Sequence, residues 1–230
     1  MASQAPETGM VRRILIVEDH PIFCMGLSDL IAHEPDLEVC KNVADVNSGI
    51  EAIANTNPDL LILDLALKSS NGMDLLKHVS CHCRRLPVLV LSTYDEQIYA
   101  ERCLQAGARG YINKKEASES VVRAIRCIFS GNIFLSKEMT SRVLNKFQYN
   151  PKSFNNSPVK SLTNRELEVF YLIGRGFVPC KIAEQLHVST KTVYSHTERI
   201  KEKLGFSHSS ELVRFAAIWV ENENRSQESV

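Results

Sequence analysis

The sequence predicts an α/β protein: a doubly wound, five-stranded parallel sheet followed by a small all-α domain. Two observations lead to this prediction. From residue 12 to residue 129, short runs rich in Val, Ile and Leu alternate with segments of helical periodicity, which is typical of a parallel sheet covered by helices on both faces. After residue 160 the apolar residues recur at helical spacing alone, which predicts a second domain made only of helices.

Each predicted strand is a short apolar run bounded by polar or turn-forming residues. In chain order the strands are Ile14–Val17, Leu37–Val43, Leu60–Leu63, Val88–Leu91 and Gly110–Ile112. Helical segments separate consecutive strands, so the strands are expected to run parallel. Ligands of such sheets bind outside the carboxyl ends of the strands, and functional side chains are expected at that edge.

The first domain is expected to span residues 10–131, because Gly131 is a typical residue just beyond the end of a helix. Residues 132–160 form a predicted linker. Within it, Ser136 can cap a short helix that runs through Phe147. The remainder of the linker is rich in Asn, Ser, Pro and Lys and has little apolar content.

The second domain is expected to span residues 161–220 and to contain a helix-turn-helix. Thr163 and Glu166 have the spacing of a capping box, which starts the first of its helices. The three predicted helices are Thr163–Ile173, Cys180–Leu186 and Ser189–Leu204. The two ends of the chain, residues 1–10 and 221–230, are polar without apolar periodicity, so we expect them to be disordered.

Composition narrows the class of protein. The 230 residues are 44% hydrophobic and 23% charged, which suits a globular chain with a buried core. The first ten residues do not resemble a signal peptide and no long apolar run is present, so we expect a cytoplasmic protein without membrane attachment. The seven scattered cysteines favour reduced thiols. Because 27 basic side chains balance 27 acidic ones, any surface for nucleic acid must be local.

Acidic side chains follow two of the predicted strands. Glu18 and Asp19 come directly after the first strand, and Asp64 comes directly after the third. Parallel strands end at one edge of the sheet, so the three carboxylates are expected to converge. Clustered carboxylates repel one another unless a cation lies between them, and Mg²⁺ prefers oxygen ligands. The sequence therefore predicts a Mg²⁺ site at this edge.

A hydroxyl and a lysine are expected at the same edge. Ser92 closes the fourth strand, and Lys114 lies just beyond the fifth. A carboxylate can act as nucleophile towards a phosphoryl donor while Mg²⁺ and a lysine neutralise the charge on the transferred oxygens. Asp64 is therefore the candidate phosphoryl acceptor.

Five motifs in the first domain resemble those of a NarL/FixJ-type receiver: Ile16-Val17-Glu18-Asp19-His20-Pro21, Leu63-Asp64, Gly72, Leu91-Ser92 and Gly110-Tyr111-Ile112-Asn113-Lys114. The resemblance implies that Asp64 accepts a phosphoryl group from a sensor histidine kinase. It implies that Lys114 pairs with the phosphate, and that Mg²⁺ is held by Glu18, Asp19, Asp64 and the carbonyl group of Ala66.

The resemblance also implies a conformational switch. Ser92 would turn towards the phosphoryl oxygens while Tyr111 packs inward, and the changed face would dimerise or release the DNA-binding elements. The chain departs from the family at two positions, because Lys68 and Lys115 stand where relatives often have proline. The geometry of those loops is therefore not carried over from the family.

The second domain resembles a LuxR-type helix-turn-helix over nearly its whole length, through Leu162-Thr163, Arg165-Glu166, Ile182-Ala183, Val188-Ser189, Thr192-Val193, Lys203-Leu204-Gly205 and Glu211-Leu212-Val213. The resemblance implies that the helix after Ser189 enters the major groove, where side chains contact base edges and cations hold phosphates. The candidate DNA-binding residues are Thr190, Lys191, Thr192, Tyr194, Ser195, Arg199, Lys201 and Lys203.

Two features of this domain leave alternatives open. Tyr194 and Glu198 stand where relatives often carry lysine. Glu198 either accepts a hydrogen bond from a cytosine amino group or repels backbone phosphates, and we favour the second interpretation. The apolar stripe on the last helix is either a dimer surface, as in the family, or internal packing; its residues are Leu212, Phe215, Ala216 and Trp219.

Taken together, the motifs predict a two-component response regulator that is not an enzyme. Phosphorylation of Asp64 would switch dimerisation and DNA binding and so regulate transcription. The expected partners are a sensor histidine kinase, double-stranded promoter DNA, RNA polymerase and, after phosphorylation, a second copy of the chain. No membrane partner is expected.

Three other functions compete with this prediction. A phosphatase of the haloacid dehalogenase type needs a second aspartate two residues after its nucleophile, and Ala66 occupies that place. A thiol or metal sensor could use Cys81 and Cys83 with the neighbouring histidines His78 and His82. An orphan regulator would share the fold but act without phosphorylation; the presence of the complete acidic, hydroxyl and lysine set favours retained phosphorylation.

Overall fold

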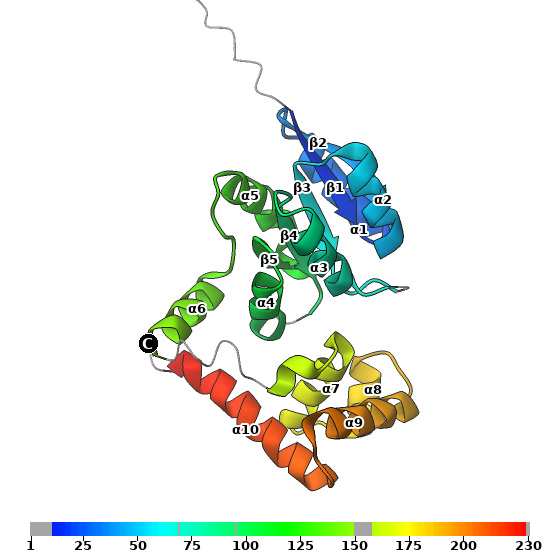
Figure 1. Ribbon diagram of the computed structural model, residues 1–230, viewed down its shortest axis with the longest axis vertical. Coiled ribbons are helices and arrows are strands. Elements are labelled where there is room, and N and C mark those ends of the chain that lie inside the picture. Colours follow the sequence, from blue (N-terminus) through cyan, green and yellow to red (C-terminus); the bar gives the residue numbers. More distant parts are fainter. Residues whose placement is uncertain (1–10, 69, 95, 150–157, 229–230) are drawn as a thin grey trace, which may run out of the picture. The chain divides into compact units, whose positions relative to one another are not determined.

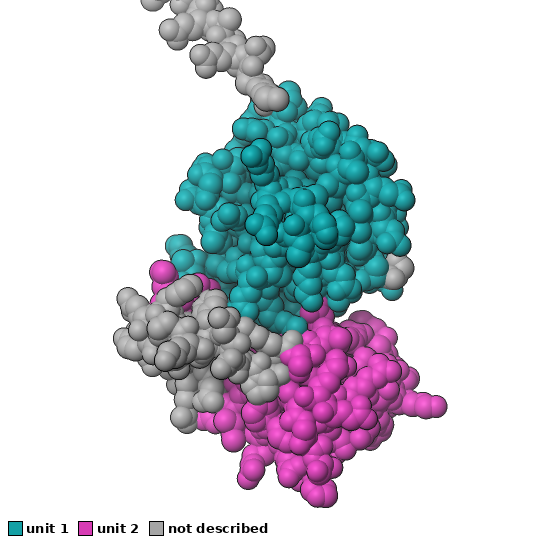
Figure 2. All heavy atoms as spheres, in the orientation of Figure 1, with its two compact units in different colours: residues 1–140 teal, residues 141–230 magenta. Residues whose placement is uncertain are grey.

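The computed structural model describes residues 11–68, 70–94, 96–149 and 158–228. Two compact units, residues 1–140 and 141–230, make up the chain (Figure 2). The first unit is α/β and the second is all-α, as the sequence predicts. The boundary between the units falls inside α6 (Lys137–Tyr149), the helix predicted for the linker, which continues two residues beyond the expected end. The first ten residues, predicted to be disordered, lie outside the described residues.

The first unit contains the predicted five-stranded parallel sheet (Figure 1). Its strands are β1 (Arg12–Val17), β2 (Leu37–Val43), β3 (Leu60–Asp64), β4 (Val88–Ser92) and β5 (Gly110–Asn113). The strand order is β2-β1-β3-β4-β5, and all neighbouring strands are parallel. This order reverses direction between β1 and β3, where doubly wound sheets bind their ligands.

Alternate residues of each strand face different layers of helices, as the two-residue period of a strand requires. Helices α1 and α5 cover one face, where their buried side chains form a single apolar cluster with Ile14, Ile16, Leu60, Ile62, Leu89, Leu91 and Ile112. The other helices of the unit complete the doubly wound arrangement. The α-helices that pack on the sheet are α1 (Pro21–Ala32), α2 (Val46–Thr56), α3 (Gly72–His82), α4 (Glu96–Gln105) and α5 (Ala117–Phe129), and a 3₁₀ turn, Lys114–Glu116, precedes α5.

Among its described residues, the second unit contains the end of α6, a short 3₁₀ helix, Pro158–Ser161, and four further α-helices: α7 (Asn164–Gly174), α8 (Pro179–Gln185), α9 (Thr190–Leu204) and α10 (Ser209–Glu228). The capping box predicted at Thr163 is present, because the side chains of Thr163 and Glu166 each bond the backbone amide of the other. Ser189 caps α9 through the amide of Thr192 (3.0 Å). Residue Gly205 ends α9 at a φ of 73°, a conformation that favours glycine.

The prediction of a disordered carboxyl-terminal tail is wrong for residues 221–228, because α10 continues through Glu228. Starting a helix is costly, but each residue added to an existing helix gains a hydrogen bond without repeating that cost. The tail contains no Gly or Pro to stop the helix. Its polarity therefore indicated exposure and not the absence of a helix.

Candidate functional site

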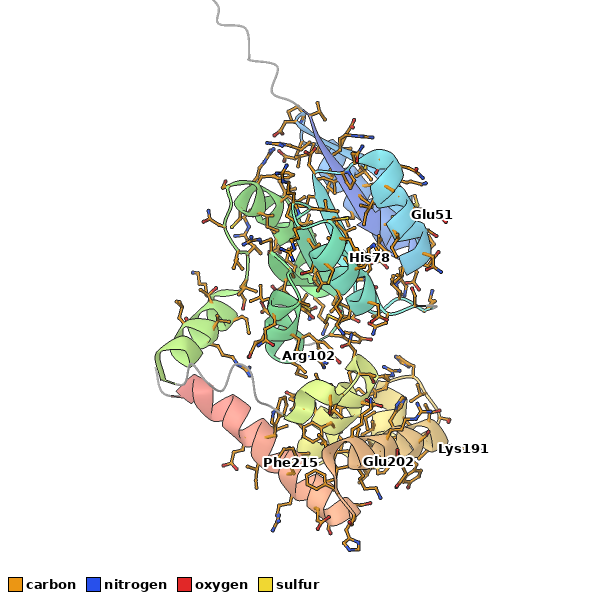
Figure 3. All side chains as sticks on the ribbon, viewed as in Figure 1. Glu51, His78, Arg102, Lys191, Glu202 and Phe215 are labelled. Carbon is orange, nitrogen blue, oxygen red and sulfur yellow. The ribbon has the colours of Figure 1, made fainter. Side chains whose placement is uncertain are left out.

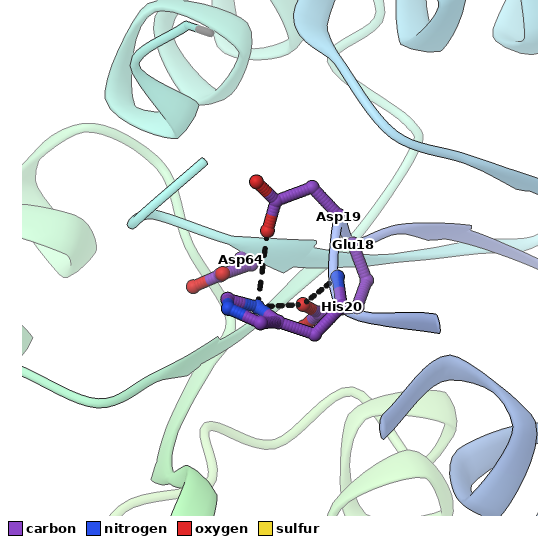
Figure 4. A group of neighbouring side chains, drawn as sticks. All are labelled: Glu18, Asp19, His20 and Asp64. Carbon is purple, nitrogen blue, oxygen red and sulfur yellow. Dashed lines mark hydrogen bonds and ion pairs between the residues drawn. The ribbon is translucent and has the colours of Figure 1, made fainter. Parts of the chain in front are cut away.

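The predicted acidic residues meet at the carboxyl edge of the sheet. Glu18 and Asp19 directly follow β1, and Asp64 is the last residue of the neighbouring strand β3. Glu18, Asp19, His20 and Asp64 each offer a potential ligand atom, and these atoms lie within 4.8 Å of one another (Figure 4). Glu18 and Asp64 are buried. The fold thus concentrates carboxylate groups at one partly dehydrated site.

Lys114 provides the cation inside this cluster. Its ammonium nitrogen lies 2.8 Å from Asp64 Oδ2 and 2.6 Å from Glu18 Oε2, and its side chain is only 8% exposed. The ring of Phe23 lies beside the ammonium group, 4.7 Å from its nitrogen to the ring centroid. Burial raises the pKa of Asp64, and the neighbouring ammonium opposes that shift. Lys114 therefore offsets part of the negative charge of the cluster.

Asp19 and His20 form the outer side of the cluster. The backbone amide of Lys68 donates to Asp19 Oδ2 (2.7 Å), a bond that proline at this position would remove because proline has no N–H. The departure at Lys68 therefore has a structural consequence. The ring nitrogen Nδ1 of His20 donates to Glu18 Oε1 (2.9 Å) and lies 3.0 Å from Asp19 Oδ1. The sequence prediction assigned no role to His20, although its place directly after the acid pair pointed to this edge.

Ala66 and Gly72 fix the backbone around Asp64. The amide of Ala66 donates to Asp64 Oδ1 (3.0 Å). Gly72, the first residue of α3, packs directly on the acceptor residue: a Cβ there would lie 2.1 Å from the carbonyl oxygen of Asp64 and 2.7 Å from Leu65 Cα. A glycine is needed because the backbones of β3 and α3 approach so closely.

The predicted switch residues lie beside the cluster. Ser92 is fully buried at the end of β4, and its hydroxyl accepts a hydrogen bond from the amide of Tyr94 (3.2 Å). The side chain of Tyr111 is buried, and its hydroxyl donates to the carbonyl oxygen of Tyr94 (2.9 Å). Tyr111 therefore packs inward, as the family resemblance implies. The switching role of the pair stays a prediction.

In the second unit, α8 and α9 form the predicted helix-turn-helix. Val193 and Ile200 are fully buried and anchor α9 to its own domain. The opposite face is exposed: it carries Lys191, Ser195, Arg199 and Tyr194, of which Tyr194 is 56% exposed. Lys191 lies near the amino-terminal end of α9 and points away from the domain (Figure 3). Thr190 and Thr192 are half-buried beside the cap of the helix.

Both domains match known families. Residues 14–126 match the response regulator receiver domain, and residues 160–216 match the luxR family of bacterial regulatory proteins. The oxygen regulatory protein NreC of Staphylococcus epidermidis is 32% identical over 209 residues, which cover 89% of this chain and 96% of NreC. The chain belongs to the two-component response regulators with a LuxR-type DNA-binding domain. It is a regulator of transcription.

Solved structures agree with this assignment. A structure of the response regulator RcsB from Salmonella typhimurium covers 90% of this chain and 98% of RcsB, with 25% identity and a TM-score of 0.54. A LuxR-family two-component response regulator from Aurantimonas is 26% identical, with a TM-score of 0.56. The match covers 60% of this chain and 99% of the Aurantimonas chain. The receiver and helix-turn-helix folds of the regulator are therefore confirmed.

Two of the predicted DNA-binding lysines of the regulator are engaged within the domain. Lys201 is only 14% exposed and pairs with Glu198 (2.9 Å). The ammonium of Lys203 lies 2.6 Å from Glu166 Oε2, so it joins the end of α9 to the start of α7. Lys203 therefore has a structural role that spacing along the helix did not indicate. The ion pair between Lys201 and Glu198 also reduces the repulsion that Glu198 would exert on phosphates.

The apolar stripe on α10 packs within the DNA-binding domain. Leu212 and Ala216 are fully buried, and the rings of Phe215 and Trp219 contact Phe170 of α7, with centroids 5.9 and 5.5 Å apart. Internal packing therefore covers Leu212 and Ala216, and the role of the stripe as a dimer surface stays a prediction. The large apolar side chains that α10 exposes are Val213 and Ile218.

The cysteine and histidine cluster does not assemble a site of three or more ligands within the described ranges. The rings of His78 and His82 stack with centroids 4.4 Å apart, and His82 Nδ1 donates to the carbonyl oxygen of His78 (3.0 Å). Cys81 is exposed and Cys83 is half-buried, both as free thiols. None of the helices in the described part of the regulator is long and apolar enough to cross a membrane.

Proposed function

We propose that Asp64 accepts a phosphoryl group from a sensor histidine kinase in a Mg²⁺-dependent reaction, and that phosphorylation switches dimerisation and promoter binding. The observation that carries this proposal is the position of Lys114, whose ammonium lies between the carboxylates of Asp64 and Glu18 (2.8 and 2.6 Å). Such a cation can leave the carboxylates and pair with oxygens of a phosphoryl group that arrives at Asp64.

The residues present suit Mg²⁺. Three carboxylates and one ammonium leave two negative charges when His20 is neutral, which equals the charge that a divalent cation neutralises. Oδ1 of Asp19 is buried, and its one close polar neighbour among the described residues is His20 Nδ1, 3.0 Å away. Glu18, Asp19, Asp64 and the carbonyl group of Ala66 would hold the ion. When bound, Mg²⁺ neutralises charge on the transferred oxygens.

The chain's own groups perform the transfer as follows. A carboxylate oxygen of Asp64 attacks phosphorus, the O–P bond forms, and the N–P bond to the kinase histidine breaks. The amide of Ala66 holds Asp64 Oδ1 (3.0 Å) and orients the carboxylate. Lys114 neutralises the phosphoryl charge, and the hydroxyl of Ser92 then turns from Tyr94 towards a phosphoryl oxygen. Tyr111 stays packed inward and fills the space beside it.

The same proposal assigns the parts of the chain. Residues 10–131 act as the receiver, 132–160 as the linker and 161–220 as the DNA-binding domain. The exposed face of α9 would enter the major groove, with Lys191 and Arg199 on phosphates and Tyr194 and Ser195 towards base edges. The regulator would act as a homodimer in the cytoplasm, where promoter DNA and RNA polymerase lie.

The test is the mass of the intact chain after incubation with acetyl phosphate, with and without Mg²⁺. We expect one phosphoryl adduct that requires Mg²⁺ and is absent in Asp64→Asn. The matched control is Asp74→Asn, which makes the same chemical change at an exposed residue of α3, and it should retain the adduct. An adduct on Asp64→Asn, or none on the wild type even with candidate kinases, would contradict the proposal; the second result would favour an orphan regulator.

A further inference from the structure

The linker helix α6 begins with half of a capping box. The hydroxyl of Ser136 accepts a hydrogen bond from the amide of Met139 (3.0 Å). In a complete box, the third helical residue is Glu or Gln, and its side chain accepts a bond from the amide of the cap residue. Met139 holds that third position and cannot accept such a bond. By contrast, Thr163 and Glu166 form a complete box at the start of α7.

Glu96 supplies the missing acceptor from another helix. The amide of Ser136 donates to Glu96 Oε1 (3.1 Å), although the two residues lie 40 positions apart. Glu96 is the first residue of α4. The side chain of Glu96 is half-buried, and this burial raises the pKa of its carboxyl group. A carboxylate at the amino terminus of a helix is also favoured by the helix dipole.

The segment just before Ser136 is fixed to the edge of the sheet. The amide of Phe134 donates to the carbonyl oxygen of Arg109 (3.0 Å), and the carbonyl oxygen of Phe134 accepts from the amide of Tyr111 (3.0 Å). The start of α6 is therefore held by β5 through the backbone and by α4 through the side chain of Glu96.

A short loop, Ser92–Tyr94, leads from the phosphoacceptor edge towards Glu96, which lies two positions further along the chain. Within it the amide of Tyr94 bonds the Ser92 hydroxyl (3.2 Å), and the carbonyl oxygen of Tyr94 accepts from Tyr111 (2.9 Å) and Asn113 (3.3 Å). If the Ser92 hydroxyl turns towards a phosphoryl group, the amide of Tyr94 loses its acceptor. The loop, and Glu96 two positions beyond it in the chain, can then shift.

We propose that Glu96 is a positioning residue that couples the phosphorylation state of Asp64 to the cap of the linker helix α6, and thereby to DNA binding. The inference rests on the proposed function. In the unphosphorylated chain Glu96 closes the cap of α6. Phosphorylation moves the loop after Ser92, opens the bond between Glu96 and Ser136, and frees the start of the helix that leads to the DNA-binding domain.

The experiment compares the full-length wild type with Glu96→Ala, with and without Mg²⁺ and beryllofluoride as a phosphoryl mimic. Hydrogen exchange is followed at the amides of residues 136–140. Binding is measured to a duplex selected from random DNA by the phosphorylated wild type. In the wild type, the mimic should speed exchange at Ser136. In Glu96→Ala, exchange should be fast in both states, and the ratio of DNA affinities with and without the mimic should fall by about 5-fold, the lower end of typical coupling between sites.

Three variants separate coupling from stability. Glu96→Gln keeps an acceptor and should restore most of the wild-type response. Ser136→Ala removes the hydroxyl of the cap but keeps the amide that bonds Glu96, so it should loosen α6 without abolishing the response. Glu51→Ala removes an exposed carboxylate of α2 (Figure 3) and should behave as the wild type. All of them should accept phosphoryl groups from acetyl phosphate at the wild-type rate.

Two results would overturn the inference while the proposed function stands. One is a phosphorylated wild type whose exchange at Ser136 does not change. The other is a Glu96→Ala variant that keeps the full wild-type response in both exchange and DNA affinity. A wild type that takes up neither acetyl phosphate nor beryllofluoride would instead contradict the proposed function, and the coupling with it.

Discussion

Replacing Gly72 by alanine should damage both the stability of the receiver and the chemistry of Asp64. The added Cβ would lie 2.1 Å from the carbonyl oxygen of Asp64, whereas real Cβ contacts stay above 3.0 Å. The partner is backbone, so no side-chain rotation relieves the overlap, and β3 or α3 must shift by about 1 Å. Overpacking of this kind typically costs about 1–3 kcal/mol, and we expect about 3 kcal/mol because both partners are backbone.

The same shift displaces the phosphoryl acceptor. A misplacement of about 1 Å at a reacting group can lower a rate by about 100-fold. We therefore expect Gly72→Ala to slow phosphorylation by acetyl phosphate by about one to two orders of magnitude, in addition to the loss of stability. The rate is followed by the mass of the intact chain under conditions in which the variant is folded.

Urea unfolding measures the stability. Trp219 is the one tryptophan of the chain and lies in the DNA-binding domain, so the urea midpoint of its fluorescence should be the same in Gly72→Ala as in the wild type. The part of the circular-dichroism transition that comes from the receiver should move to lower urea. The control is Gly26→Ala in α1, where a Cβ would meet nothing within 4 Å; the helix propensity of alanine should stabilise that variant by up to about 1 kcal/mol. A Gly72→Ala variant as stable and as reactive as the wild type would refute the close approach of β3 and α3.

Three further predictions concern charged groups. Burial raises the pKa of Asp64, so its ionisation costs stability as pH rises. Asp64→Asn should therefore be more stable than the Mg²⁺-free wild type at pH 7, by on the order of 1 kcal/mol. A urea midpoint of Asp64→Asn equal to or below that of the wild type would contradict this prediction. Burial opposes ionisation of Glu166, but bonds from Lys203 and Thr163 hold its pKa below the ordinary 4.5. The stability that ionised Glu166 gives is therefore present above pH 4.5 and is lost as the pH falls below it. Glu166→Gln should lower the free energy of unfolding by about 1–2 kcal/mol at pH 7 and by less in acid. Unfolding is followed by Trp219 fluorescence, and a loss of stability that does not change with pH would refute this prediction. Lys191→Ala should reduce the salt dependence of DNA binding by about one unit of slope, whereas Lys201→Ala, at a position only 14% exposed, should change it little; equal slopes would contradict the exposure argument.

Much of the fold could be predicted because its signals are local. The apolar runs place all five strands, since an alternation between buried strands and amphipathic helices is visible in the sequence itself. Capping at Thr163 depends on residues three positions apart and was predicted for the same reason. Strand ends in a parallel sheet meet at one edge, so the convergence of Glu18 and Asp64 followed from their places in the chain.

Contacts between distant residues were decided only by the tertiary structure. The place of Lys114 at the edge was predicted, but its contacts with both Glu18 and Asp64 were not. The pairing of Lys203 with Glu166 across 37 residues and the bond from Ser136 to Glu96 across 40 residues also leave no periodic signal in the sequence. The stripe on α10 was visible in the sequence, but its partner was not. A local pattern fixes which face of a helix is apolar; the packing of the other helices determines whether that face meets its own domain or another molecule.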